Sequence, residues 1–182
     1  MIETKRLILR QWKESDFESF IKMGLDQDIM QFFPNLLTPQ ESLNLIQKIS
    51  LLIYENGWGF WAVELKESHE FIGFIGLHNQ PEQFDFSPCV EIGWRLAKEF
   101  WKQGYATEGA KAVLDYAFNV LNLDKVASFT ASINKPSETV MKKLGMQKVK
   151  NFDHPKVALH HELRAHVLYE ITKASFNLQL ET

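Results

Sequence analysis

Residues 103–107, Gln-Gly-Tyr-Ala-Thr, have the residue types and the position of an anion-binding turn. They stand directly before a segment with helical periodicity. The first N–H groups of a helix have no partner within it, and the helix dipole adds partial positive charge there, which suits a phosphate or pyrophosphate. Gly104 lets the backbone approach an anion closely because it has no Cβ. A glycine before a helix is by itself more often an ordinary turn, so the surrounding elements decide its weight.

The residues around this turn predict a strand, a helix, a second strand and a second helix. Between Cys89 and Leu96 apolar and polar residues alternate, as on a strand. Residues 125–133 are rich in Val, Phe, Thr and Ile, which favours the second strand. The second helix is expected to begin within residues 134–137 and to end at Gly145. The first helix has an apolar stripe formed by Ala110, Val113, Leu114, Ala117, Phe118 and Leu121.

The first half of the chain predicts further elements. Residues 7–11 indicate a strand, and residues 15–18 a capping box that opens a helix. Residues 38–41 form a second capping box, and Gly57-Trp58-Gly59 is expected to end its helix. Two strands within residues 60–78 are predicted to form a hairpin.

Four motifs, in this order along the chain, resemble the GNAT N-acetyltransferases, and within them the ribosomal-protein N-terminal acetyltransferases. The resemblance implies one N-acetyltransferase domain over residues 1–182, of α/β (α+β) class. It implies a mixed, mostly antiparallel sheet of about seven strands flanked by about four helices, with splayed central strands. The motifs are Glu3-Thr4-Lys5-Arg6-Leu7-Ile8-Leu9-Arg10, Glu91-Ile92-Gly93-Trp94, Gln103-Gly104-Tyr105-Ala106-Thr107, and Asn134-x-x-Ser137 with Lys143-Leu144-Gly145-Met146.

The resemblance implies acetyl-coenzyme A as the cosubstrate and a primary amine as the acceptor, either a peptide or protein N-terminus or a small amine. The family's loop would hold the pyrophosphate through backbone amides. One departure is Trp101, which stands where the broad superfamily has Gln or Arg, although the ribosomal-type group often has an aromatic residue there. The residues placed at the pyrophosphate are Gln103, Gly104, Tyr105, Ala106 and Thr107.

The resemblance also implies where the rest of the coenzyme lies. The pantetheine arm would pair with the backbone of Trp94, Arg95 and Leu96, and an N–H there can stabilise an oxyanion. Asn134 and Ser137 would face the coenzyme from the other strand. Lys142 or Lys143 would meet its 3′-phosphate or adenine end.

Glu91 is the candidate general base. It is the carboxylate within an otherwise apolar strand, which in this family borders the active site. A carboxylate held partly away from water has a raised pKa and can accept a proton from an ammonium. One alternative is an ordinary ion pair with Arg95 on the same face. The other is direct attack by an amine that is already neutral.

Ser137 is the candidate proton donor to the leaving thiolate. Many family members use a Tyr on the last helix for this step, but the aligned position is Met141, which cannot donate. A Ser near a helix start can instead cap that helix, and both roles can hold together.

Four aromatic residues are candidates for the wall of the acceptor site, because the loop between the first helices helps to form it in this family. Each can alternatively be an ordinary core residue. They are Phe32, Phe33, Tyr54 and Trp58.

Composition limits the remaining functions. The net charge of −3 offers no basic patch for nucleic acid, and no apolar run approaches membrane length. The histidines 154, 160, 161 and 166 match no zinc spacing, and Cys89 is the one cysteine, so no metal is expected. We therefore expect a cytoplasmic monomer or homodimer.

Two other functions compete with catalysis. A non-catalytic coenzyme A-binding module would keep the fold and the turn, and Met141 in place of the usual donor is compatible with it. An unrelated nucleotide-binding protein is disfavoured, since the chain has neither a G-x-G-x-x-G motif nor a Walker lysine.

Overall fold

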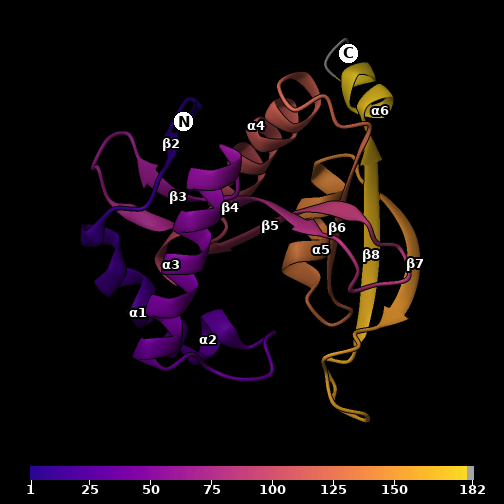
Figure 1. Ribbon diagram of the computed structural model, residues 1–182, viewed down its shortest axis with the longest axis horizontal. Coiled ribbons are helices and arrows are strands. Elements are labelled where there is room, and N and C mark those ends of the chain that lie inside the picture. The colour runs from indigo at the N-terminus through magenta and orange to yellow at the C-terminus, as the bar shows by residue number, and fades with distance from the viewer. Residues whose placement is uncertain (180–182) are drawn as a thin grey trace. The chain divides into compact units, whose positions relative to one another are not determined.

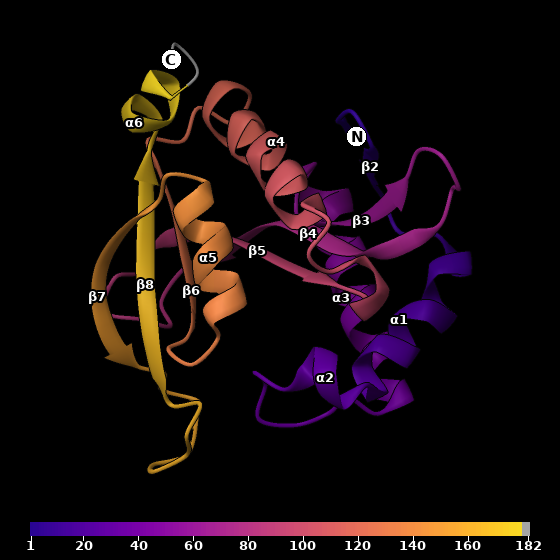
Figure 2. The same ribbon diagram turned by 180° about the vertical axis from the view of Figure 1, so that it is seen from behind.

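The computed structural model describes residues 1–179, and these residues form the helices and strands shown in Figures 1 and 2. The strands belong to one mixed sheet in the order β1-β2-β3-β4-β5-β6-β8-β7. In chain order the elements are β1 (Ile2–Glu3), β2 (Leu7–Arg10), the 3-10 turn η1 (Glu14–Asp16), α1 (Phe17–Leu25), α2 (Gln27–Met30), α3 (Pro39–Asn56), β3 (Phe60–Leu65), β4 (Phe71–Gln80), β5 (Cys89–Leu96), the 3-10 turn η2 (Lys98–Phe100), α4 (Tyr105–Asn119), β6 (Lys125–Ala131), α5 (Lys135–Lys143), β7 (Gln147–Asp153), β8 (Ala165–Thr172) and α6 (Lys173–Leu178).

This architecture confirms the predicted mixed α/β sheet. The described residues hold eight strands and six α-helices, against about seven and about four expected. Short elements account for much of the difference, since β1 has two residues, α2 four and α6 six. The predicted succession of strand, helix, strand and helix is confirmed as β5, α4, β6 and α5. No helix among residues 1–179 combines the length and the apolar character needed to cross a bilayer.

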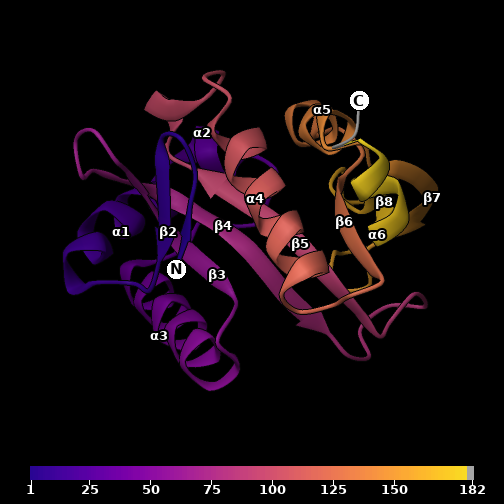
Figure 3. The same cartoon turned by 90° about the horizontal axis from the view of Figure 1, so that it is seen from above.

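The chain divides into two compact units, and the first comprises residues 1–77 and 93–113. Its strands β1, β2, β3 and the start of β4 pair antiparallel, with Leu9 opposite Val63 and Phe60 opposite Gly76. Helices α1 and α3 pack against each other on one side of β2–β4, and the first turns of α4 lie on the other side (Figure 3).

Local signals explain the ends of α3. Thr38 and Glu41 form the predicted capping box, since the Thr38 side chain accepts from the Glu41 N–H and the Glu41 carboxylate accepts from the Thr38 N–H. Gly57 ends the helix with φ of 78°, a left-handed conformation that glycine adopts without a steric penalty.

The second unit comprises residues 78–92 and 114–182. Strand β6 runs parallel to β5, with Ala127 opposite Glu91, and antiparallel to β8. Strand β7 pairs antiparallel with β8, and α5 lies along β6 (Figure 2). These pairings hold the start of β5 and the start of α5 within one unit.

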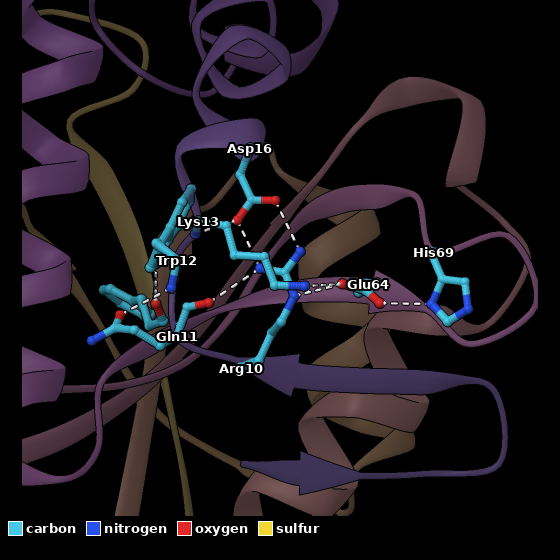
Figure 4. A network of polar contacts seen from close by, with 8 residues as sticks. Arg10, Gln11, Trp12, Lys13, Asp16, Glu64 and His69 are labelled. Atoms are coloured by element: carbon cyan, nitrogen blue, oxygen red, sulfur yellow. Dashed lines mark hydrogen bonds and ion pairs between the residues drawn. The ribbon is translucent and has the colours of Figure 1, made fainter.

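A network of buried charges joins β2, β3 and the turn η1 in the first unit (Figure 4). The Arg10 guanidinium donates to both oxygens of Asp16, at 2.7 and 2.9 Å, and through Nε to Glu64 at 2.6 Å. Burial raises the pKa of Glu64, but hydrogen bonds from His69, Arg10 and Lys13 outweigh this and hold it at about 2. Each buried charge in this network therefore has a partner of opposite sign.

One sequence prediction fails beside this network. The capping box expected at residues 15–18 is wrong, because Ser15 lies inside η1 and α1 begins at Phe17 without a side-chain cap. Glu18, the expected partner of Ser15, pairs with Lys22 instead. The Asp16 carboxylate at this junction accepts from Arg10 and from the Lys13 N–H at 2.8 Å.

We predict that Arg10→Met lowers the free energy of unfolding by about 3–5 kcal/mol, since it leaves two buried carboxylates without their shared cation. Lys13→Met is the matched control, because the Lys13 side chain is 56% exposed and its bond to Glu64 should contribute less than about 1 kcal/mol. Urea titrations of both variants measure the difference. An equal loss in the two variants would contradict the role assigned to Arg10.

Candidate active site

The turn before α4 presents backbone donors as the sequence predicts. Gly104 has φ of 84°, and the first hydrogen bond of α4 runs from the Glu108 N–H to the Gly104 carbonyl at 3.0 Å. Among the described residues, no carbonyl or side chain accepts from the N–H groups of Tyr105, Ala106 or Thr107. Three N–H donors therefore remain at the positive end of a fifteen-residue helix.

An ion pair holds this turn against the N-terminal strands. The Glu108 carboxylate accepts from the Thr4 hydroxyl at 2.6 Å and from the Arg6 backbone N–H at 2.8 Å. It also accepts from Arg6 Nε at 2.6 Å, and Arg6 Nη1 donates to the Gln103 carbonyl at 3.0 Å. The Arg6 guanidinium lies 4.3 Å from the centre of the Tyr105 ring. Arg6 thus fixes both sides of Gly104.

Trp101 and Gln103 use their side chains to shape the loop. The Trp101 indole N–H donates to the Leu96 carbonyl at 2.8 Å, and the Gln103 amide donates to the Glu99 carbonyl at 2.8 Å. The indole therefore ties the loop to the end of β5. The Trp101 bond explains why an aromatic residue with an N–H group stands at position 101. Because the Gln103 side chain is bonded to Glu99, residue 103 can bind an anion only through its backbone.

In the second unit, Glu91 is a shielded carboxylate on β5. Its Oε2 accepts from the Gln80 side-chain amide on β4 at 2.5 Å. Burial raises its pKa to about 7, although the Gln80 hydrogen bond opposes the shift. The alternative ion pair with Arg95 is not among the ion pairs of the described residues, and the Glu91 carboxylate bonds to Gln80 within its own unit. A carboxylate with this pKa is suited to accept and release a proton near neutral pH.

The start of α5 brings Asn134 and Ser137 together. Asn134 is the N-cap, because its side-chain oxygen accepts from the Ser137 N–H at 3.2 Å. Its amide donates to the Ser137 hydroxyl at 3.1 Å and to the Thr130 hydroxyl at 2.9 Å. The capping role that sequence reasoning offered to Ser137 therefore belongs to Asn134. As the Ser137 oxygen accepts from Asn134, its hydroxyl hydrogen is left to donate elsewhere.

Three other side chains of α5 have different environments. Met141 is 1% exposed and is a core residue. Glu138 accepts from the buried Tyr169 hydroxyl at 2.7 Å and pairs with Lys135 and, at 3.6 Å, with Lys142. Lys143 is exposed and has no ion-pair partner among residues 1–179, so of the two lysines it is the better placed to meet a phosphate.

The four expected acceptor-wall residues, all in the first unit, differ in their exposure. Tyr54 is 84% exposed, so the core alternative is wrong for it. Phe33 is 42% exposed, and its ring centre lies 4.2 Å from the Arg95 guanidinium. Phe32 and Trp58 are half-buried. Only Phe33 among the four contacts a charged group that sequence reasoning also placed at the site.

The histidines and acids of the second unit serve other purposes. His154 and His166 lie with phenylalanines 84, 86, 129 and 152 in an aromatic cluster, and burial lowers the pKa of His154 to about 4. A small cavity beside them contains Asp85 and Asp153, which pair with Lys150 and Arg164. Burial raises the pKa of the Cys89 thiol to about 11, which argues against a nucleophile. Among the described residues, no group of three or more His, Cys, Asp or Glu side chains could hold a metal ion.

Sequence reasoning missed Arg6 and Glu108 as partners, and Gln80 as the partner of Glu91. Arg6 was visible within the opening motif, but nothing in the sequence links it to a residue 102 positions away. Gln80 lies at the end of β4, two residues beyond the predicted strand. An alternation of apolar and polar residues that continued to residue 80 would have placed Gln80 on the strand.

Comparison with known proteins places this geometry in a family. Residues 6–147 match the family model described as "Acetyltransferase (GNAT) domain". The chain is 28% identical to the uncharacterized N-acetyltransferase YoaA of Bacillus subtilis (strain 168) over 150 residues, covering 81% of this chain and 83% of the relative. It is 32% identical to the uncharacterized protein YkkB of the same organism over 149 residues, covering 79% and 83%.

Solved structures share the fold. A GNAT-family acetyltransferase from Bacillus anthracis superposes with a TM-score of 0.80 at 25% identity, covering 95% of this chain and 98% of that one. The ribosomal-protein-S5-alanine acetyltransferase from Vibrio fischeri has a TM-score of 0.74 at 19% identity, covering 96% and 97%. Spermidine N-acetyltransferase from Vibrio cholerae, in complex with CoA and spermine, has a TM-score of 0.74 at 20% identity, covering 96% and 99%.

Proposed function

The chain belongs to the GNAT acetyltransferase family, and from this premise we propose that it transfers the acetyl group of acetyl-coenzyme A to a primary amine by direct attack within a ternary complex. The observation that carries the proposal is Glu91, a shielded carboxylate with a pKa raised to about 7. A non-catalytic coenzyme-binding protein has no need of a buried group that titrates near neutral pH.

The coenzyme phosphates are assigned to the turn before α4. The N–H groups of residues 105–107 and the helix dipole supply the positive end, and the Thr107 hydroxyl adds a donor. Gln103 and Gly104 would contribute backbone only. Lys143, which has no ion-pair partner among the described residues, is assigned to the 3′-phosphate or adenine end. The family resemblance assigns the pantetheine arm to the backbone of residues 94–96.

The chemistry requires a proton to leave the ammonium, and Glu91 takes it directly or through water. The neutral nitrogen then attacks the thioester carbonyl carbon, forming the C–N bond, and a backbone N–H of the 94–96 segment stabilises the oxyanion. The C–S bond breaks as the carbonyl reforms. The leaving thiolate takes the hydroxyl proton of Ser137, whose oxygen is held by Asn134. The Ser137 oxygen then receives the surplus proton of the attacking nitrogen, and Glu91 releases its proton to water, so the products are the neutral amide and the free thiol.

The acceptor is a primary amine, either a peptide or protein N-terminus or a small amine. The names of structural neighbours include a ribosomal-protein acetyltransferase and a spermidine acetyltransferase, so both acceptor classes occur on this fold. We propose that Phe32, Phe33, Tyr54 and Trp58 line the acceptor side.

We predict that wild-type kcat/KM rises with pH near pH 7, and that Glu91→Gln lowers kcat/KM by about 10²–10⁴-fold and removes this rise. The measurement is a pH series with acetyl-coenzyme A and a primary amine. An unchanged pH profile in the variant would assign the proton transfer to another group.

The same substitution should stabilise the fold at high pH. The pKa of Glu91 is about 7 when folded and 4.5 when unfolded, so its contribution to stability is complete below pH 4.5 and is lost as pH rises through 7. Glu91→Gln should therefore unfold with a free energy higher than wild type by on the order of 1–3 kcal/mol at pH 8. Lower activity with higher stability separates a lost base from a damaged fold.

We predict that Gly104→Glu weakens acetyl-coenzyme A binding by roughly 100-fold or more, because it sets a carboxylate against the phosphates. Gly57→Glu is the matched control, since Gly57 has a similar φ of 78° and an added Cβ there meets nothing within 4 Å. Both variants share the backbone strain and the added charge. Calorimetric titration measures the affinities, and equal affinity in the two variants would refute the assignment of the turn.

A further inference from the structure

Arg95 is a half-buried arginine whose hydrogen bonds are incomplete. Its Nε and Nη1 atoms are buried and have no partner among the described residues. Unpaired buried charge is costly, and most buried polar groups in folded proteins are bonded. Burial lowers the pKa of Arg95 to about 10, so the group still carries its charge at neutral pH. The side chain therefore needs acceptor atoms that the described residues do not provide.

Arg10, in the same unit, shows how a buried guanidinium obtains hydrogen-bond acceptors in this chain. Arg10 is 8% exposed and bonds to two carboxylates, those of Asp16 and Glu64. Within residues 1–179, Arg95 has no such carboxylate. The contrast indicates that the acceptor for Arg95 comes from outside these residues.

Two aromatic rings hold the Arg95 side chain in place. The guanidinium carbon lies 4.2 Å from the centre of the Phe33 ring and 5.4 Å from that of Phe74. Contacts with ring faces stabilise the cation, but they leave its N–H groups without acceptors. Phe33 is 42% exposed while Phe74 is 7% exposed, so Phe33 is the ring of this pair that a ligand can reach.

A residue of the proposed acceptor wall relates Arg95 to the acceptor. Phe33, which is proposed to line the acceptor side, lies in the same unit, and its ring centre is 4.2 Å from the Arg95 guanidinium. An acceptor that contacts Phe33 can therefore place a second group against Arg95. A carboxylate is the group that an arginine binds best.

We propose that Arg95 binds a carboxylate of the acceptor, so that the acceptor class is an amine that also carries a carboxylate. This inference rests on the proposed acetyl transfer for the identity of the ligand as an acceptor. It assigns Arg95 a side-chain role in specificity, beyond the backbone role given to residues 94–96.

Matched pairs of ligands that differ only by the carboxylate test the proposal. The pairs are phenylalanine with phenethylamine, ornithine with putrescine, and glutamate with 4-aminobutyrate. Calorimetric titrations with and without coenzyme A measure binding without turnover. We expect the carboxylate-bearing member of at least one pair to bind about 10- to 100-fold more tightly, as a charge-assisted hydrogen bond would give. Equal or weaker binding of that member in every pair, or no binding by any, would overturn the proposal.

Variants locate the effect on the side chain. Arg95→Gln should bring the ratio of the two affinities close to one, and Arg164→Gln, which removes a partly exposed arginine of the second unit, should leave it unchanged. Phe33→Leu is the second variant should Arg95→Gln fail to fold, because it removes an exposed ring and no buried charge. It should lower the ratio by a smaller factor. A ratio unaffected by the folded Arg95→Gln, or by Phe33→Leu where that protein does not fold, would refute the assignment.

Three further outcomes separate this inference from the acetyl transfer and from a role in coenzyme binding. Selective binding without acetylation of any pair would refute the transfer and leave the carboxylate site standing. Acetylation with a ratio near one would refute the site and leave the transfer standing. Loss of coenzyme A affinity in Arg95→Gln, with no change in the ratio, would assign the guanidinium to the coenzyme and overturn the proposal.

Discussion

A charged group that loses much of its water must find a partner or change its protonation, and Arg10, Glu91 and Arg95 meet that constraint in different ways. Arg10 is paired with two carboxylates and joins two strands to a turn. Glu91 has an amide partner and a raised pKa. Arg95 has aromatic contacts but incomplete hydrogen bonds. The first arrangement stabilises the fold. In the other two, Glu91 can accept a proton from a substrate and Arg95 can donate hydrogen bonds to one.

The anion-binding turn depends on contacts that are distant in the sequence. Gly104 supplies the left-handed conformation, but Arg6 and Glu108 hold the segment to the N-terminal strands. Trp101 ties the same loop to the end of β5. The backbone donors at the start of α4 are therefore fixed before any ligand arrives, which reduces the ordering cost of binding.

The sequence predicted the features that depend on residues close to one another in the chain. The alternation in β5, the apolar stripe of α4, the capping box at Thr38 and the stop at Gly57 all act within a few residues, and each was confirmed. The failures concern side chains with two possible partners. The capping box expected at residues 15–18 is replaced by η1, whose Asp16 bonds to Arg10, and Asn134 takes the capping role offered to Ser137. Glu91 bonds to Gln80. Only the tertiary structure decides between such partners.

The central claim is that this chain binds acetyl-coenzyme A, and thermal unfolding with and without that ligand tests it most directly. At a ligand concentration near 100 times Kd, binding to the folded state adds about 2.7 kcal/mol of stability. For a chain of this length that corresponds to a rise in Tm of roughly 5–10 °C. We expect such a rise with acetyl-coenzyme A and none with unrelated nucleotides. An unchanged Tm at saturating acetyl-coenzyme A would contradict the account.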